Sequence, residues 1–133
     1  MNRIATITCI LLLALLGGCG GMSPFQASPS AVVKSYYQHC NAGEYSKVEE
    51  LLATDSKKLV HGELGALAGG MQGICKINTR DGTYIGIDIK SETIRGEGAV
   101  VVSDIHYKDK DDKLGDKSSL VRENGSWKIS TAE

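Results

Sequence analysis

The sequence contains little of what several large classes of protein depend on. Among its 133 residues there are one tryptophan, one phenylalanine and two prolines, and 15 lysines and arginines are nearly balanced by 16 acidic residues. It contains no block of lysine or arginine, so it offers neither the basic surface nor the aromatic platforms that nucleic-acid binding requires. The apolar run from Ile4 to Leu16 would reach only about 20 Å as a helix, against a hydrocarbon core of about 30 Å. We therefore expect neither a nucleic-acid partner nor a transmembrane helix.

The amino-terminal run has the pattern of a secretory signal, because Arg3 supplies a positive charge and uncharged, mostly apolar residues follow it. It ends in LGGC, residues 16–19, which resembles the lipobox of bacterial lipoproteins: a branched aliphatic residue, two small residues and a cysteine. The resemblance implies that residues 1–18 are a signal peptide and that the Cys19 thiol carries a diacylglyceryl group. The alternative is an ordinary secretory signal, which would leave a free thiol in an oxidising compartment.

Lipidation would fix the protein to a membrane, because each buried CH₂ contributes about 0.8 kcal/mol and two or three acyl chains hold firmly. In Gram-negative lipoproteins an aspartate after the cysteine retains the protein at the inner membrane, and here that residue is Gly20. The resemblance therefore implies a location in the cell envelope, at the outer membrane and facing the periplasm. Residues 19–27 are small and polar and predict a lipidated tether. Removing 18 of the 133 residues leaves 115, enough for one domain over residues 28–133.

The cysteines suit an oxidising compartment. Cys9 would leave with the signal and Cys19 would carry lipid, so Cys40 and Cys75 remain. An even remainder in such a compartment favours a disulfide between these two residues.

Helical periodicity predicts three helices. Ser28 and Pro29 have the pattern of an N-cap and a first helical residue, and an apolar stripe follows until about Gly43. A second helix is predicted over residues 44–54. A third apolar stripe runs from residue 60 to 74 but is interrupted by five glycines, so we expect that helix to fray or break after about residue 68.

The rest of the chain changes to a period of two, which predicts strands. The turns between them are expected at residues 96–98 and at Asn124–Gly125, with a polar loop over residues 108–117. Helices followed by antiparallel strands indicate an α+β fold with helices on one sheet face. The four expected strands cover residues 85–90, 99–107, 118–122 and 127–129.

Two segments carry a resemblance to a known fold: SPSAVVKSYYQHCNAGEYSKVEELL over residues 28–52 and LVRENGSWKIS over residues 120–130. They resemble the cone-shaped domains of the nuclear transport factor 2-like, or cystatin-like, superfamily, and in particular its small bacterial lipoproteins of unknown function. The resemblance implies N-terminal helices packed on a curved antiparallel sheet. Enzymes of this superfamily use Asp, His or Tyr side chains that point into the cone, and the sequence shows no evident acid or base at such a position.

Strand parity tests three candidates for that role. If Ile85, Ile87 and Ile89 face the core, Asp88 faces away, and if the apolar residues of strand 99–107 face inward, Asp104 and His106 face solvent. A bulge could reverse the parity, so an Asp104 and His106 dyad remains an alternative.

The other polar residues that could form a site are expected to have structural roles. His39 and Cys40 are adjacent on a helix and so point about 100° apart, which argues against a catalytic thiol and imidazole pair. His61 is expected at a helix edge. The acidic loop departs from a calcium-binding loop, because its sixth position from Asp109 is Leu114 and its twelfth is Leu120. We expect no catalytic residue, metal or cofactor.

These observations favour a lipid-anchored, periplasm-facing module that binds a small apolar ligand or an envelope protein without catalysis. Two alternatives remain: a small isomerase or hydro-lyase that uses the cone, and an inhibitor or immunity-type partner of another envelope protein. The residues expected to line a pocket are aromatic or sulfur-containing: Tyr36, Tyr37, Met71, Tyr84, Tyr107 and Trp127.

Overall fold

A computed structural model describes residues 26–131 of the chain. The predicted signal peptide, the lipidation site Cys19 and all of the predicted tether except residues 26 and 27 lie outside the described residues. Within residues 26–131, no helix is both long and apolar enough to cross a bilayer.

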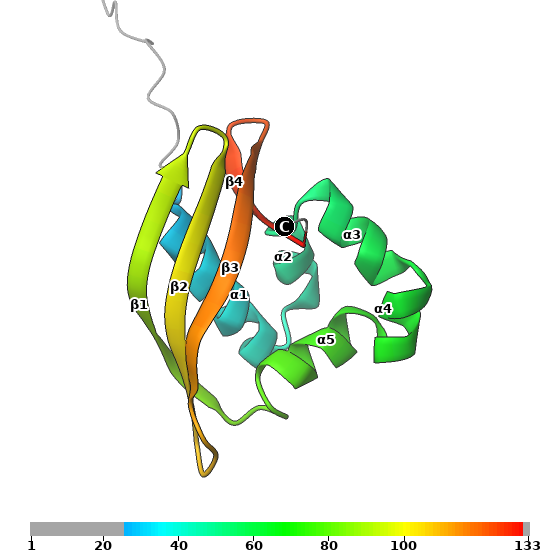
Figure 1. Ribbon diagram of the computed structural model, residues 1–133. Coiled ribbons are helices and arrows are strands. Elements are labelled where there is room, and N and C mark those ends of the chain that lie inside the picture. Colours follow the sequence, from blue (N-terminus) through cyan, green and yellow to red (C-terminus); the bar gives the residue numbers. More distant parts are fainter. Residues whose placement is uncertain (1–25, 132–133) are drawn as a thin grey trace, which may run out of the picture.

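The described residues form a helical layer packed on one antiparallel sheet, which is the expected α+β class (Figure 1). The strands follow one another in the order β1-β2-β3-β4, so each pair of neighbours is a hairpin. The helices are α1 (Pro29–Ala42), α2 (Tyr45–Glu50), α3 (Thr54–His61), α4 (Glu63–Ala68) and α5 (Gly70–Asn78). The strands are β1 (Tyr84–Arg95), β2 (Gly98–Tyr107), β3 (Lys113–Glu123) and β4 (Ser126–Ser130).

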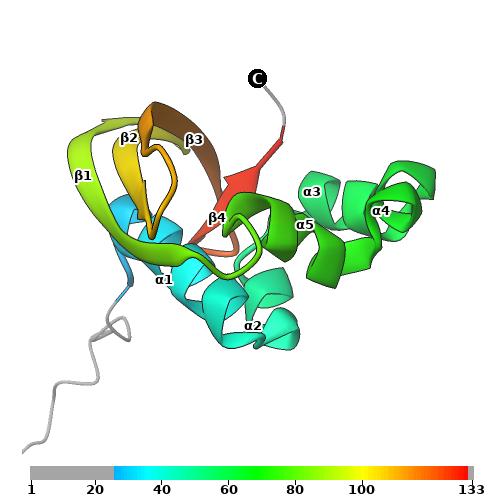
Figure 2. The same cartoon turned by 90° about the horizontal axis from the view of Figure 1, so that it is seen from below.

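The sheet curves around α1, and α3 to α5 extend past its β4 edge (Figure 2). The α1 helix begins as predicted, because the Ser28 hydroxyl accepts a hydrogen bond from the Ala31 amide and Pro29 follows as the first helical residue. It ends at Gly43, whose φ of 73° is the left-handed conformation that favours glycine. At the β4 edge, Leu52 forms a parallel bridge with Ile129, whose backbone N–H and C=O are bonded to Leu51 and Ala53.

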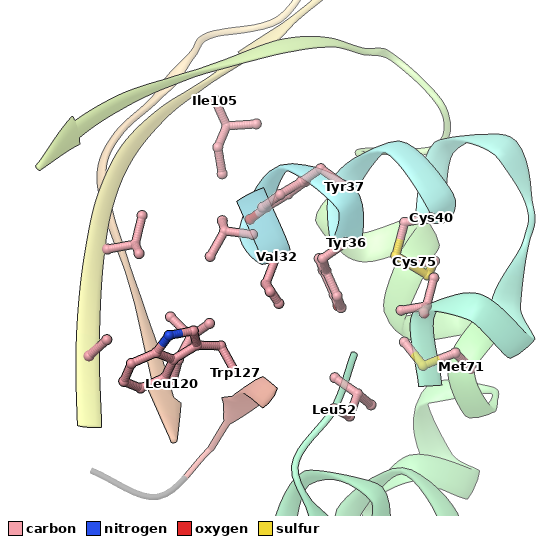
Figure 3. Close-up of a cluster of buried hydrophobic side chains, with 14 of the residues drawn as sticks. Val32, Tyr36, Tyr37, Cys40, Leu52, Met71, Cys75, Ile105, Leu120 and Trp127 are labelled. Atoms are coloured by element: carbon pink, nitrogen blue, oxygen red, sulfur yellow. A yellow bond between two sulfur atoms is a disulfide. The ribbon is translucent and has the colours of Figure 1, made fainter. Parts of the chain in front are cut away.

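The core lies between α1 and the concave face of the sheet (Figure 3). Val33 and Val48 from the helices meet Val101, Ile105 and Leu120 from the strands, and all five are essentially inaccessible to solvent. Burial of side chains of this size stabilises a fold by about 1.5 to 3 kcal/mol each. The same cluster contains most of the aromatic side chains: Tyr36, Tyr37, Tyr107 and Trp127.

The predicted disulfide is confirmed. Cys40 near the end of α1 is bonded to Cys75 in α5, with 4.9 Å between their Cα atoms. The bond closes a loop with a sequence separation of 35 residues, for which the chain-entropy relation gives about 3 to 4 kcal/mol of stabilisation. It fixes α5 against α1, and it therefore sets where α5 lies relative to the sheet.

The prediction of three helices was wrong, because residues 26–131 form five. The expected break after residue 68 is present, since Gly69 adopts a φ of 87° and ends α4 there. A further break occurs at Gly62, whose extended backbone separates α3 from α4. The expected second helix also divides, into α2 and the start of α3.

Two glycines allow these short helices to meet at sharp corners. A Cβ added at Gly65 would lie 1.9 Å from the carbonyl oxygen of Val60, and one added at Gly73 would lie 1.6 Å from that of Ala68. No side chain fits at such distances, so both positions require glycine. These two glycines thus allow close contact between successive helices, and the atoms nearest to them belong to the preceding helix rather than to the sheet.

The strands are longer than predicted, and one residue expected to face the core, Ile85, does not. The pairing of β1 with β2 is irregular between Tyr84 and Gly86, and Ile85 in that bulge is exposed rather than buried. Ile87 and Ile89 pack against the core as expected. Residues 108–117 were expected to form a loop, but residues 113–117 belong to β3.

We predict that Gly73→Ala lowers the free energy of unfolding by about 2 kcal/mol, because the new methyl group forces α4 and α5 apart. Urea denaturation of the variant and the parent protein measures this difference. Gly86→Ala is the matched control, since a Cβ there meets nothing within 4 Å and we expect a change of less than about 0.5 kcal/mol. Equal stability of the two variants would show that the corner tolerates a side chain.

Candidate functional site

The three polar residues tested by strand parity all lie on the outer face of the sheet, as predicted. Asp88 is 73% exposed at its side chain, and those of Asp104 and His106 are partly exposed. The Asp104 and His106 dyad does not form, because each has other partners. Asp104 accepts a hydrogen bond from the Gly115 amide at 2.8 Å and lies 3.5 Å from the Lys90 ammonium, so it holds Gly115 where the pairing of β2 with β3 is irregular.

His106 is bracketed by two carboxylates. Its Nδ1 lies 2.7 Å from Asp112 and its Nε2 lies 2.8 Å from Asp88, which links β2 to both β1 and the loop before β3. The hydrogen bond with Asp112, followed by that with Asp88, raises the pKa of His106 above its usual 6.5. The hydrogen bond from His106 lowers the pKa of Asp112 below its usual 3.8. The cluster faces solvent and connects β2 with β1 and with the loop before β3.

An inward carboxylate exists at a position that sequence reasoning missed. Asp116 in β3 accepts a hydrogen bond from the Tyr37 hydroxyl at 3.2 Å and forms an ion pair with Lys113 at 2.5 Å. It pairs across the sheet with Ser103, which is fully buried, so both belong to the inner face. The signal lay in the alternation of β3, since Leu120 is buried and Asp116 lies an even number of residues before it.

Two tyrosines of α1 surround this polar position from the helical side. Burial raises the pKa of Tyr37, and the neighbouring charge of Asp116 raises it further, so the hydroxyl stays protonated at neutral pH. Burial likewise raises the pKa of Tyr36, whose hydroxyl oxygen accepts a hydrogen bond from the Asn78 amide at 2.7 Å. Tyr107 donates to the Asn78 carbonyl at 2.9 Å, and this bond ties the end of α5 to β2.

Two cavities adjoin at these residues. The first, named here the apolar groove, has a volume of about 340 Å³ and lies between α3, α4, α5 and β4. The second, named here the polar cavity, has a volume of about 330 Å³ and lies between α1 and β3. The groove is lined chiefly by Leu52, Leu59, Val60, Leu64, Met71 and Ile74, and the polar cavity by Tyr37, Lys113, Asp116, Lys117, Ser118 and Ser119. Tyr36, Asn78, Ile129 and Thr131 line both.

The residues expected to line a pocket divide between cavity and core. Tyr36 and Met71 line the apolar groove, and Tyr36 and Tyr37 line the polar cavity. Figure 3 shows these three side chains around α1 and α5. The structure places the other three elsewhere: Tyr84 stacks on Tyr37 with 5.7 Å between ring centroids, and Tyr107 and Trp127 are buried in the core.

The remaining polar candidates have structural partners. His39 contacts Glu44 at 2.5 Å and His61 lies 3.3 Å from Glu49, while Cys40 is held in the disulfide. Between residues 26 and 131, no group of three or more His, Cys, Asp or Glu side chains is arranged to hold a metal ion.

Comparison with protein-family models finds no match, and comparison with curated proteins finds none either. Solved structures do match. One, from Campylobacter jejuni, has a name that suggests an NTF2-like transpeptidase: identity is 13%, the match covers 78% of this chain and 98% of that one, and the TM-score is 0.56. Another, from Thiobacillus denitrificans, has a name that suggests a calcium/calmodulin-dependent protein kinase type II association domain, with 15% identity, 83% and 99% coverage and a TM-score of 0.55.

A third match is a SEC-C motif containing protein from Rhodopseudomonas palustris, with 13% identity, 80% and 78% coverage and a TM-score of 0.58. This chain has the NTF2-like fold. At these identities the comparisons show the fold alone, so the activities in those names are not carried over.

We predict that the stabilising effect of His106 depends on pH. A raised pKa in the folded state means that the contribution is fully present below about pH 6.5 and is lost as the pH rises through the raised value. The lowered pKa of Asp112 means that its contribution is lost as the pH falls below about 3.8. The difference in Tm between the parent and His106→Gln should therefore be largest at about pH 4 to 6.5 and shrink at alkaline pH.

Thermal denaturation followed by circular dichroism, from about pH 4 to alkaline pH, measures the effect. His61→Gln is the control, because it removes an exposed imidazole with one carboxylate partner, and we expect a smaller change in Tm at every pH. A His106→Gln difference that does not vary with pH would contradict the assignment.

Proposed function

We propose that the protein is a lipid-anchored binding module of the bacterial cell envelope that faces the periplasm and holds a small apolar ligand in the apolar groove. The observation that carries this proposal is the groove itself, which is apolar over most of its lining and opens at the surface beside α3 and α4. Its volume of about 340 Å³ falls within the usual range of ligand pockets. The Cys40–Cys75 disulfide supports an oxidising compartment, and the lipobox supports the anchor.

The surface around the groove supports a binding role as well. Leu64 is 68% exposed and Leu67 is 84% exposed, although both belong to a short helix at the groove entrance. Exposed leucines placed together on a soluble domain are typical of a surface that meets a ligand or partner. An apolar ligand that covers Leu64 would remove this side chain from water.

A second candidate function is a small isomerase or hydro-lyase, because Asp116 is a carboxylate on the lining of the polar cavity and accepts from Tyr37. Lys113 already neutralises this carboxylate through an ion pair at 2.5 Å. A proton-abstracting role would require substrate to displace that ammonium group. For this reason binding is the function we propose.

The anchor leads to one prediction. Membrane-extracted protein should show cleavage before Cys19 and the added mass of the acyl chains by intact-mass spectrometry. Cys19→Ala should abolish that mass and release or misprocess the protein. A soluble, unmodified form cut at another position would overturn the lipoprotein assignment.

The groove leads to another prediction, tested with the mature chain, residues 19–133, carrying Cys19→Ala. The described helices, the strands and the disulfide lie within residues 29–130, so this chain keeps all of them. Leu64→Glu should weaken binding of the neutral fluorophore N-phenyl-1-naphthylamine about tenfold, because a carboxylate replaces a leucine contact. Ile77→Glu is the matched control, since Ile77 is 67% exposed and does not line the groove.

Fluorescence titration measures both variants. Unchanged binding in Leu64→Glu, or an equal loss in both variants, would show that the fluorophore does not occupy the groove. Turnover of a carbonyl substrate that Asp116→Asn abolishes would instead favour the enzyme candidate.

A further inference from the structure

The α4 helix and the neighbouring part of α3 carry apolar side chains that the described residues leave in water. Leu64 and Leu67 lie one helical turn apart on α4, and both are largely exposed. Leu59 of α3 is 44% exposed and lines the apolar groove together with Leu64. These three leucines are named here the leucine tip. An exposed apolar surface of this kind is typical of a site that meets a partner or a membrane.

The leucine tip continues into a segment without charge. Residues 64–75 contain no Asp, Glu, Lys or Arg, although these residues make up 23% of the chain. Lys58 and Glu63 before this segment and Lys76 after it are exposed. A bilayer accepts an uncharged apolar surface without the cost of burying charge, and the flanking charges can stay in the headgroup layer. The pattern therefore suits a membrane surface.

A protein partner would be expected to meet different side chains. Binding energy at protein–protein interfaces is concentrated in Trp, Tyr and Arg. Residues 59–75, which run from the leucine tip to the disulfide, contain none of these three types. Leucine, alanine and glycine offer a protein few specific contacts, whereas insertion into lipid requires only apolar area.

The proposed anchor would keep a membrane within reach of the leucine tip. Residues 19–25 can extend to about 25 Å at most, and they lead to Gln26, whose side chain lies beside Gly125 in the turn between β3 and β4. At the same turn, the Glu123 carboxylate accepts a hydrogen bond from the Thr54 amide at 2.9 Å. The α3 helix begins there and runs towards α4 over about 12 Å (Figure 1). The tether is about twice as long as α3, so an anchored domain can rest with the leucine tip on the bilayer.

We propose that the leucine tip docks on the membrane that holds the lipid anchor, with α4 in the boundary between headgroups and acyl chains. This inference rests on the lipid anchor proposed above and adds a second contact between the domain and the bilayer. Because Leu59 and Leu64 belong to both the tip and the apolar groove, the mouth of the groove then faces lipid. An apolar ligand can pass between the groove and the bilayer without crossing water.

The test uses the acylated protein in vesicles of phosphatidylethanolamine and phosphatidylglycerol, with and without brominated phosphatidylcholine, which quenches tryptophan fluorescence on contact. The native Trp127 is 5% exposed and lies in the core, so it gives a constant background. Leu67→Trp should lose about half of its added fluorescence in the brominated vesicles, because the apolar face of an interfacial helix lies about 5 to 10 Å deep.

The matched control is Ile85→Trp. Ile85 is 65% exposed on β1, the edge strand opposite to the β4 edge beyond which α3 to α5 lie (Figure 2). Its added fluorescence should be the same in both kinds of vesicle. Leu64→Glu, added to Leu67→Trp, should remove most of the quenching, because a carboxylate one turn away disfavours burial of α4 in lipid. Ile85→Glu, added to Leu67→Trp, should leave the quenching unchanged.

The outcomes separate this inference from the proposals above. If Leu67→Trp carries acyl mass but is not quenched, the docking is overturned, the anchor stands, and an envelope protein becomes the better occupant of the leucine tip. Equal quenching of Leu67→Trp and Ile85→Trp would also overturn it, since the domain would then have no preferred face. Absence of acyl mass on Cys19 would remove the anchor and this inference with it, whereas the titration with N-phenyl-1-naphthylamine tests the groove alone.

Discussion

The packing of α1 into the concave face of the sheet is the contact on which the rest of the molecule depends. One face of this helix contributes Val33, Tyr36 and Tyr37 to the core. These side chains belong to the same buried cluster as Val101 and Ile105 of β2. The apolar side of α1 is buried against the sheet that forms later in the chain. The sheet curves around this helix, and α3 to α5 lie beyond its β4 edge (Figure 2).

The cavities result from how these helices are attached. The disulfide attaches α5 to α1 at one point, and the breaks at Gly62 and Gly69 divide the chain there into α3, α4 and α5. Three short helices cannot cover a flat face as one long helix would, because each presents less than three turns of side chains to it. The groove lies among these three helices, so it follows from the same glycines, Gly62 and Gly69, that divide the predicted third helix. The hydrogen bond from Tyr107 to the Asn78 carbonyl fixes the inner end of this space.

The parts of the fold that local chemistry determines could be predicted from the sequence, and those that depend on distant pairing could not. Ser28 with Pro29 and Asn124 with Gly125 specify a helix start and a tight turn within a few residues, and the structure has both. The bond between Cys40 and Cys75 was predicted from the even number of cysteines expected to remain in the domain. The exposed position of Ile85 depends instead on a bulge in the pairing of β1 with β2, which a period of two does not reveal.

Asp116 shows why the chemistry of the cone was harder to predict than its shape. Its segment, KDKDDKLGDK, has the composition of a loop, and only the register with β2 makes it a strand. The left-handed Gly115, supported by Asp104, turns Asp116 to the inner face, where it meets Tyr37. A carboxylate on this partly buried wall requires a counter-charge, and Lys113 supplies one at 2.5 Å. The Lys113 ammonium and the Tyr37 hydroxyl therefore satisfy Asp116 within the fold, so a structural requirement of β3 also occupies the carboxylate that sequence reasoning missed.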